Sequence, residues 1–500
     1  MSGPPVLVVG FRVTGRSVAR YLRARGDEVV IAEDDPTDER VEAAAAMGAR
    51  FLGRTDEAAL EAAVHECRLV VPSPGIPPGH PVYRLADAAG VPVHSELELG
   101  WERLAARGSA RGAGDSGHGG GRPPALVAVT GTNGKTTVVS LVAAMLVASG
   151  RTAVAAGNIG LPFIDAAGLD VEVLVLEVSS FQLQFTERFH PAVSCWLNLA
   201  EDHLDWHPTM AHYAAAKARI WAAQRAGDVA VLNASDAGVV AAAASPAHGL
   251  PAGVTRVTFG AGGAGGPGAG DYFVDGQGML RGPGGLELVA VRELRRSLPF
   301  DIDNALAASA CALAAGASPE GCRSALRQFE NLPHRVALVA EGGGVRWYDD
   351  SKATTPASVL SAVAGFDSVV LIAGGHNKGL DLGVLARAVP PVRAVVAIGE
   401  AAKEIEAAFA ERVPVTEAPS MAEAVAAAGR VAEAGDAVLL SPGCASFDWY
   451  HSYAERGDDF AALAAARAEK VRAQEDRAGE DGAQEDRAEE DRAEEERSGV

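Results

Sequence analysis

Residues 131–137 read GTNGKTT, and their types and spacing suggest chemistry more directly than any other stretch of the chain. The apolar run ALVAVT before them predicts a buried strand, and VVSLVAAMLVASG after them predicts a helix. Backbone N–H groups in such a glycine-rich turn lie at the positive end of the helix and bind phosphate oxygens. Lys135 would neutralise the β- and γ-phosphates, and the hydroxyl of Thr136 would bind Mg²⁺. The turn therefore predicts nucleotide binding, although alone it does not separate an ATPase from a kinase or a ligase.

Two later segments contain residues that could complete such a site. Glu177 ends the apolar run in LVLEVSSFQL, where a carboxylate at the end of a strand beside a phosphate-binding turn is a natural Mg²⁺ ligand. The same residue could equally be an acid at a helix start. His203 and Lys217 lie in NLAEDHLDWHPTMAHYAAAKARIW, and taken singly they read as a surface histidine and a solvated helix lysine.

Composition limits the class of protein. The chain has 500 residues, 48% of them hydrophobic, and a formal net charge of −21, which argues against a general nucleic-acid binder or a protein of anionic membranes. Five cysteines without CxxC spacing fit a reducing compartment. No apolar run reaches the ~20 residues of a membrane helix, and the first residues do not read as a signal peptide. We therefore expect a soluble, cytoplasmic protein that inserts into no membrane.

Alternating apolar strands and helices predict an α/β protein with parallel sheets in three domains. The first has a Gly-x-x-x-x-Gly turn at Gly10 and Gly15, a weak phosphate signal because it is not the dinucleotide fingerprint. We expect flexible loops at residues 107–123 and a loop excursion at 260–285. The predicted boundaries are 1–95, 96–332 and 333–470, followed by an acidic, disordered tail at 471–500.

Taken together, the segments resemble the Mur ligases, ATP-dependent amide-forming enzymes of peptidoglycan synthesis, over nearly the whole chain to about Leu463. The resemblance rests on SPGIPPGHP, GTNGKTT, GNIG, LEVSSFQL, NLAEDHLDWH, LPHR, DDSKATTPAS, GGHNKG and LSPGCASFD, in this order. Within the family, DSKATTPAS and SPGCASFD are similar to the branch that adds D-glutamate. The D-N-P-R motif of the diaminopimelate- and lysine-adding branches is missing.

The resemblance implies a fold and a reaction. It implies a Rossmann-like N-terminal domain for the UDP group, a central P-loop ATPase-like domain and a Rossmann-like C-terminal domain for the amino acid. ATP would phosphorylate the L-alanine carboxylate of UDP-N-acetylmuramoyl-L-alanine, and the amine of D-glutamate would attack the acyl phosphate. Implied cofactors are ATP, two Mg²⁺ ions and a carbamylated Lys217. The implied setting is cell-wall synthesis during growth and division, by a protein we expect to be monomeric.

Site residues carried over from the family fall into four groups. Catalytic roles go to Lys135, His203 and Lys217. ATP would be bound by Gly131, Thr132, Asn133, Gly134, Lys135, Thr136, Thr137, Asn304, Arg335 and Asp350. Metal ligands would be Thr136 and Glu177 for one ion, and His203 and Lys217 for the other. Substrates would be bound by Val13, Thr14, Ser73 and Asn158 on the UDP-sugar side, and by Lys352, Thr354, Lys378, Ser446 and Tyr453 for D-glutamate.

Two departures from the family pattern bear on specificity. Leu298, Pro299, Phe300 and Asp301 replace the usual G-x-H-N before Asn304, so Asp301 is a candidate for the missing second adenine contact. Asp34 and Asp35 stand where some relatives have Thr-Arg. Acids there do not pair with a diphosphate, and we expect them to accept hydrogen bonds from uracil or ribose.

Two other functions remain open from the sequence. A folylpolyglutamate synthase-like ligase shares the ATP domain, but it normally lacks the separate N-terminal α/β unit that this chain has. A non-catalytic nucleotide-binding module would not need Lys135, Glu177, His203 and Lys217 together.

Overall fold

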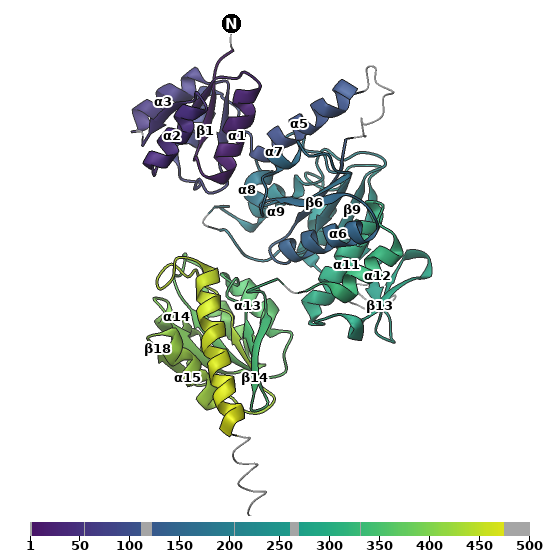
Figure 1. Ribbon diagram of the computed structural model, residues 1–500, viewed down its shortest axis with the longest axis vertical. Helices are drawn as coiled ribbons and strands as arrows, with labels where there is room; N and C mark the ends of the chain where they lie inside the picture. Colours follow the sequence, from purple (N-terminus) through teal and green to yellow (C-terminus); the bar gives the residue numbers. More distant parts are fainter. Residues whose placement is uncertain are drawn as a thin grey trace, which may run out of the picture. The chain divides into compact units, whose positions relative to one another are not determined.

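The computed structural model describes residues 3–54, 56–111, 123–204, 206–260, 270–330 and 332–474 (Figure 1). Contacts between Cα atoms divide the chain into two compact units, Met1–Glu330 and Asn331–Val500. The predicted α/β class with parallel sheets is confirmed. The exact three-domain boundaries stay a prediction, and most of the expected loop at 107–123 and nearly all of the tail at 471–500 lie outside the described residues.

The N-terminal part of the first unit is a parallel four-stranded sheet in the order β3-β2-β1-β4. Side chains of β1 alternate between two apolar cores, one with helix α1 and one with α3 and α4, which explains its continuous apolar sequence. The elements are β1 (Val6–Val9), α1 (Val13–Ala24), β2 (Val29–Ala32), α2 (Asp38–Ala46), β3 (Arg50–Gly53), α3 (Glu57–Glu66), β4 (Leu69–Pro72) and α4 (Pro81–Ala89).

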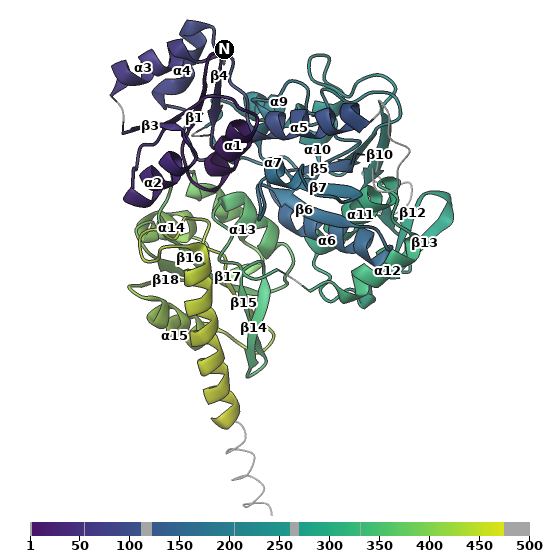
Figure 2. The same cartoon turned by 45° about the horizontal axis from the view of Figure 1, so that its top comes forward.

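A second parallel sheet, ordered β10-β9-β8-β5-β7-β6, forms the centre of the first unit. On β5, Val127 and Val129 face a core shared with α6, α11 and α12, while Leu126 and Ala128 face a core shared with α5 (Figure 2). The strands are β5 (Ala125–Thr130), β6 (Ala153–Gly157), β7 (Val173–Glu177), β8 (Val193–Trp196), β9 (Val229–Asn233) and β10 (Thr255–Phe259). The helices are α5 (Glu96–Arg111), α6 (Lys135–Ala148), α7 (Phe163–Ala166), α8 (Ser180–Leu183), α9 (Met210–Ala218), α10 (Ala237–Ala243), α11 (Pro299–Ala314) and α12 (Pro319–Gln328).

Two loop predictions were partly wrong. Residues 107–111 continue helix α5, and part of the glycine-rich stretch at 260–285 contributes to a three-stranded antiparallel sheet. Its strands are β11 (Phe273–Val274), β12 (Met279–Gly282) and β13 (Leu286–Ala290). Leu280 and Leu288 bury their side chains in the central core, and this apolar anchoring outweighs the low strand propensity of the glycines around them.

The second unit is a six-stranded sheet in the order β14-β15-β19-β16-β17-β18. The hairpin of β14 and β15 is antiparallel, and the other neighbours are parallel. Its elements are β14 (Ala337–Gly342), β15 (Val345–Asp349), α13 (Pro356–Val363), β16 (Val369–Gly374), β17 (Val392–Ile398), α14 (Ala402–Phe409), β18 (Val415–Ala418), α15 (Met421–Val431) and β19 (Ala437–Leu440). Residues 453–474 form a further helix, along which Phe460 and Ala464 enter the core.

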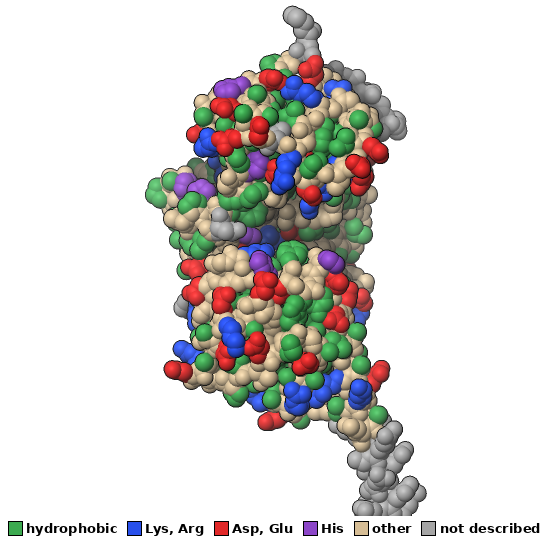
Figure 3. All heavy atoms as spheres, turned by 90° about the vertical axis from the view of Figure 1, so that its left-hand side faces the viewer, with side chains coloured by type: hydrophobic (Ala, Val, Ile, Leu, Met, Phe, Trp, Pro, Cys, Tyr) green, Lys and Arg blue, Asp and Glu red, His purple; other side chains and the backbone are tan. Residues whose placement is uncertain are grey.

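Among the described residues, no helix is both long and apolar enough to span a bilayer. On the face drawn in Figure 3, basic side chains are interspersed with acidic ones. That distribution agrees with the sequence argument against general nucleic-acid binding.

Candidate active site

The GTNGKTT segment forms the predicted turn between β5 and α6. Helix α6 begins at Lys135, and its N-cap Gly134 has a left-handed φ of 84°. A Cβ on Gly134 would lie 2.5 Å from the side-chain oxygen of Asn304, so only glycine fits this position. The turn is further held by the segment that follows β8, because the N–H of Asn133 donates to Asn198 Oδ1 (2.8 Å) and the N–H of Ala200 donates to Thr132 Oγ1 (3.0 Å).

Two lysines converge on one carbonyl of this turn. Lys135 Nζ donates to the carbonyl oxygens of Gly131 and Thr132, each at 2.8 Å. Lys217 Nζ, from α9, also donates to the Gly131 oxygen at 2.8 Å. Two lysines 82 positions apart in the sequence therefore bring their amino groups to the same turn.

Lys217 is buried, with a relative exposure of 1%. Its Nζ lies 4.5 Å from the ring centroid of Tyr213. Burial lowers the pKa of Lys217 well below its usual value, the charge of Lys135 lowers it further, and Asp202 acts in the opposite direction. Lys217 is therefore not the solvated helix lysine that its neighbours in the sequence alone would suggest.

Glu177 connects the turn with the GNIG segment. The hydroxyl of Thr136 donates to Glu177 Oε2 at 2.7 Å, and Asn158 Nδ2 donates to Oε1 at 3.1 Å. Glu177 is the last residue of β7 and is 4% exposed. Three residues predicted from separate motifs therefore form one hydrogen-bonded group at the carboxyl end of the sheet.

His203 lies in the loop before α9 with a left-handed φ of 55°. Its Nε2 is 3.3 Å from Asp202 Oδ2, and its ring packs against Phe181 with centroids 4.5 Å apart. A second histidine, His207, was not singled out from the sequence. It is fully buried, its Nε2 is 2.9 Å from Ser180 Oγ, and burial lowers its pKa to about 3. A neutral His207 thus supports the loop that holds His203.

The donor set around the turn suits Mg²⁺, which prefers oxygen ligands and usually keeps several waters and phosphate oxygens. A hydroxyl and a carboxylate already meet at Thr136 and Glu177. Within the described ranges, no group of three or more His, Cys, Asp or Glu side chains is arranged to hold a metal by itself. The residues therefore fit an ion that is completed by a bound nucleotide.

A pocket of about 560 Å³ in the first unit is lined by four predicted substrate residues, Val13, Thr14, Ser73 and Asn158. Asp34 and Asp35 line it as well. They are joined there by Gly10, Arg12, Glu33, Pro74, Gly75, Ile76, Pro77, Gly157, Ile159, Gly160, Pro162 and Gln182. The pocket thus connects the turn before α1 with the GNIG segment beside Glu177.

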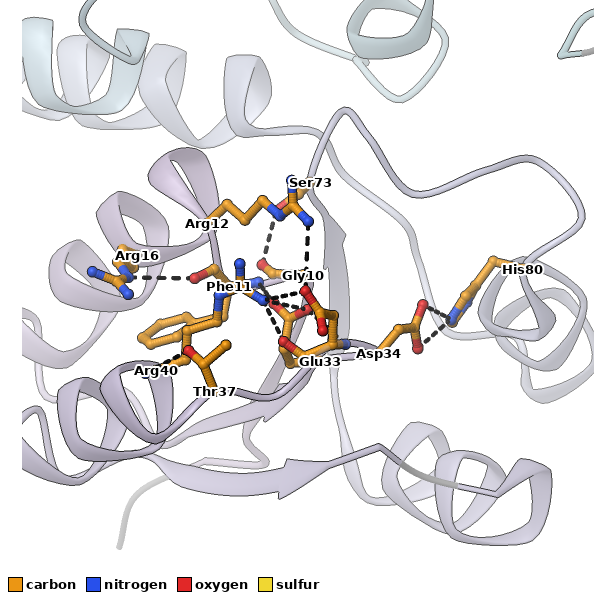
Figure 4. A network of polar contacts seen from close by, with 11 residues as sticks. Gly10, Phe11, Arg12, Arg16, Glu33, Asp34, Thr37, Arg40, Ser73 and His80 are labelled. Carbon is orange, nitrogen blue, oxygen red and sulfur yellow. Dashed lines mark hydrogen bonds and ion pairs between the residues drawn. The ribbon is translucent and has the colours of Figure 1, made fainter. Parts of the chain in front are cut away.

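The turn before α1 is fixed by a polar network (Figure 4). Glu33, which is 5% exposed, accepts the N–H groups of Phe11 (2.6 Å) and Asp35 (3.0 Å). Ser73 Oγ donates to the Gly10 carbonyl at 2.8 Å. A Cβ at Gly15 would lie 1.9 Å from that carbonyl oxygen, so the close approach of α1 requires glycine there.

Asn304 and Asp301 lie on α11, but they differ in their surroundings. The side-chain oxygen of Asn304 lies against Gly134, in the GTNGKTT turn. Asp301 accepts two hydrogen bonds from Arg296 (2.6 and 2.7 Å) and one from the Leu298 N–H (3.2 Å) at the helix start. Since these contacts engage both carboxylate oxygens, we favour a structural role for Asp301 over an adenine contact.

In the second unit, the loops that carry the predicted D-glutamate residues lie next to one another. Lys352 Nζ is 5.0 Å from the ring centroid of Tyr453. The Gly443 N–H donates to the Ala353 carbonyl (2.9 Å), next to Thr354. His376 and Ala445 exchange backbone hydrogen bonds (2.9 and 3.0 Å), which places the loop of Lys378 beside that of Ser446.

Asp350 is buried in this unit and accepts a hydrogen bond from Ser441 Oγ at 2.7 Å. Burial raises its pKa to about 7, against the lowering effects of Ser441 and Arg335. The neighbouring Asp349 is 2.6 Å from His334 Nδ1, in the LPHR segment that contains Arg335.

Arg456 organises these loops and was missed from the sequence. It is 1% exposed, and its guanidinium donates to Ser351 Oγ (2.9 Å) and to the carbonyls of Ser351 (2.8 Å), Cys444 (3.2 Å) and Ala445 (3.2 Å). Burial lowers its pKa to about 10. The segment AERGDD offers no reason to single out its arginine, because the partners come from two distant loops.

Known proteins are similar to this chain over most of its length. Family models match in three places, the Mur ligase MurD-like N-terminal domain at residues 5–95, the Mur ligase middle domain at 129–263 and the Mur ligase glutamate ligase domain at 334–444. A protein of Frankia casuarinae named UDP-N-acetylmuramoylalanine–D-glutamate ligase is 45% identical over 474 residues, covering 93% of this chain and 95% of the relative. The chain belongs to the Mur ligase family. A relative of the same name from Thermobifida fusca is 39% identical, over 94% of this chain and 99% of its own length.

Solved structures of Mur ligases share the fold. Crystal structure I of MurF from Acinetobacter baumannii has a TM-score of 0.54 at 17% identity, covering 92% of this chain and 91% of that one. The UDP-N-acetylmuramate–alanine ligase MurC of Thermotoga maritima has a TM-score of 0.52 at 19% identity, covering 91% and 98%. At these identities the likeness concerns the fold and not the substrate.

Proposed function

We propose that this Mur ligase joins D-glutamate to UDP-N-acetylmuramoyl-L-alanine in an ATP-dependent reaction of peptidoglycan synthesis. Two relatives with this printed name align over more than nine-tenths of the chain. The observation that carries the proposal is the arrangement at the turn, where Lys135 and Lys217 meet at Gly131 beside the pair of Thr136 and Glu177. Such a cluster is suited to phosphoryl transfer, in which catalysis is mainly positioning and charge neutralisation.

In the first step, the L-alanine carboxylate attacks the terminal phosphate of ATP, forming an acyl phosphate and ADP. The turn amides and Lys135 would hold the phosphates, and Asn158 would position the carboxylate from the pocket side. When bound, Mg²⁺ supplies positive charge against the phosphate oxygens, with Thr136 and Glu177 as its protein ligands at the turn and His203 and Lys217 at a second position.

Lys217 is suited to carbamylation, because CO₂ reacts only with a neutral amine and the pKa of this buried lysine is strongly lowered. The product is a carboxylate on a lysine stem, and the neutral amine nitrogen loses one proton as its bond to the CO₂ carbon forms. That carboxylate would place a negative charge next to Lys135 and supply oxygens for the second ion.

In the second step, the amine of D-glutamate attacks the acyl carbon, and phosphate leaves the tetrahedral intermediate. Lys352, Lys378, Thr354 and Ser446 provide the cations and hydroxyl donors that a dicarboxylate needs, with Tyr453 beside Lys352. Arg335 and Asp350 are proposed ATP contacts in the same unit. The substrates are cytoplasmic small molecules in this scheme, and we propose that the protein acts there as a monomer.

Phosphate release from ATP tests the function. We expect release only when both UDP-N-acetylmuramoyl-L-alanine and D-glutamate are present, and far less with L-glutamate. Turnover with a folate substrate and L-glutamate would instead support a folylpolyglutamate synthase-like ligase. Nucleotide binding without turnover would support a non-catalytic module.

A further inference from the structure

The pocket at the turn before α1 has an unusual balance of charge for the ligand proposed to bind there. Three carboxylates line it, those of Glu33, Asp34 and Asp35. A UDP-linked sugar brings further negative charge with its diphosphate. Among the described residues around this pocket, Arg12 is the single basic side chain.

The two neighbouring arginines, Arg16 and Arg40, are already paired with acidic side chains. Arg40 contacts the carboxylates of Glu33 (3.4 Å) and Asp35 (3.3 Å), and its side chain is only 14% exposed. Arg16 is 2.9 Å from Glu39 and donates weakly to the Phe11 carbonyl (3.4 Å). In Figure 4, the side chains of Arg12 and Arg16 leave the turn in opposite directions. Neither Arg16 nor Arg40 lines the pocket.

The acids differ in how firmly they are held. Glu33 binds two backbone N–H groups, and Asp34 lies 3.4 Å from His80. Asp35 is 70% exposed and lies 3.8 Å from the guanidinium of Arg12, which is 74% exposed. Exposed ion pairs at such a distance are weak, so Arg12 can exchange Asp35 for a better anion at little cost.

Arg12 is also placed at the right end of the helix. It is the N-cap residue of α1, next to Val13 and Thr14, and α1 has no acidic residue in its first turn. Backbone N–H groups and the positive helix end already favour an anion at this point. A guanidinium can bind phosphate oxygens through two parallel hydrogen bonds. The present contact of Arg12 with Asp35, at 3.8 Å, is too long for such a pair of hydrogen bonds.

We propose that Arg12 binds the diphosphate of the UDP-linked substrate, and that Asp35 holds this arginine at the pocket when no substrate is bound. This inference rests on the proposed function for the identity of the ligand. Some relatives have Thr-Arg at the positions of Asp34 and Asp35, so this chain lacks their arginine at this place. We assign the role of a phosphate-binding cation in this pocket to Arg12 instead.

The test is direct binding of UDP and of uridine to the full-length protein, with Arg12→Gln, Arg16→Gln, Asp35→Asn and the double variant Arg12→Gln/Asp35→Asn. We expect Arg12→Gln to weaken UDP binding about tenfold or more while uridine binding stays unchanged, because uridine has no phosphate. Arg16→Gln is the matched control and should bind both ligands like the wild type. Asp35→Asn should bind UDP as well as or better than the wild type, because it releases Arg12.

Each opposite result overturns the proposal. Unchanged UDP binding by Arg12→Gln would do so, and so would an equal loss for UDP and uridine. Wild-type UDP binding by the double variant would show that Arg12 only offsets the charge of Asp35. If Arg12→Gln did not fold, weaker UDP binding by Asp35→Asn would still overturn it.

UDP binding requires neither ATP nor an amino acid, so the inference can hold even if D-glutamate turnover fails. Conversely, turnover by Arg12→Gln at saturating substrate tests the proposed function independently of this arginine.

Discussion

At the scale of single residues, Lys217 is the side chain whose chemistry departs most from its type. Its amino group is buried against the Gly131 carbonyl, next to Lys135. Desolvation and a like charge both disfavour the ammonium form. These surroundings suit a modified lysine better than a free one.

We predict that Lys217→Ala lowers kcat by about a hundredfold or more, because the second ion would lose a ligand. Removing bicarbonate and CO₂ should lower wild-type activity, and adding bicarbonate should restore it. Lys403→Ala is a matched control, since this exposed lysine pairs with Glu406 and Glu417 on the surface. Full activity of Lys217→Ala in bicarbonate-free buffer would contradict this role.

The buried Asp350 makes the stability of the protein depend on pH. Its pKa is raised to about 7 by burial, whereas an unfolded aspartate titrates near ~4. Between about pH 4 and pH 7 the carboxyl group of Asp350 is ionised in the unfolded chain but still protonated in the folded protein. Its contribution to the free energy of unfolding is therefore fully present below about pH 4 and falls as the pH rises to 7.

Asp350→Asn should therefore gain stability relative to the wild type as the pH rises from about 5 to about 8, on the order of a few kcal/mol. Urea unfolding of both proteins at several pH values measures this difference. Asp367→Asn, at an exposed aspartate of the same unit, serves as the control variant. A flat difference for Asp350→Asn would contradict the shifted pKa.

At the scale of elements, the turn between β5 and α6 depends on a glycine that no other residue replaces. We predict that Gly134→Ala weakens ATP binding more than about tenfold, because its Cβ would displace Asn304 and distort the turn.

Gly150→Ala is the control that separates the effect of this clash from the effect of backbone strain at a positive φ. Gly150 has a similar φ of 78°, and a methyl group added there would meet no atom within 4 Å. The Gly150 variant should lose only about 1–2 kcal/mol of stability and keep ATP binding. Equal ATP affinity in the two variants would refute the clash.

Arg456 acts at the same scale, since it joins the loops around Ser351 and Cys444. Arg456→Lys keeps the charge but has fewer donors, and we expect the KM for D-glutamate to rise about tenfold with a smaller change in the KM for ATP. Arg467→Lys, on the same C-terminal helix, is the control and should leave both unchanged. A rise in neither KM would show that Arg456 does not position the D-glutamate loops.

The strand, turn and helix around GTNGKTT could be predicted from the sequence, because glycine, lysine and threonine at fixed spacing have few structural alternatives. The burial of Lys217 at this site could not be predicted from the residues around it in the sequence, since its hydrogen-bond partner is a carbonyl 86 positions away. The resemblance to a family supplied that position instead. Neither the residue pattern nor the family resemblance indicated Arg456, because most of its partners are backbone carbonyls, which every residue has.

At the scale of the whole molecule, the proposed reaction needs groups from both units. The GTNGKTT turn and the proposed UDP pocket lie in residues 1–330, and the proposed D-glutamate residues lie in 331–500. ATP binding would thus draw on both units, through the GTNGKTT turn in the first and the proposed contacts Arg335 and Asp350 in the second, whereas D-glutamate binding would depend on the second unit alone. A substitution that affects only D-glutamate binding should leave the acyl phosphate able to form.

The most direct measurement is phosphate release from ATP by the full-length protein with UDP-N-acetylmuramoyl-L-alanine, in the presence of D-glutamate, of L-glutamate or of neither. We predict rapid release with D-glutamate, little with L-glutamate or with no amino acid, and none from Lys135→Ala under any condition. Equal rates with the two enantiomers, or undiminished synthesis by Lys135→Ala, would contradict it.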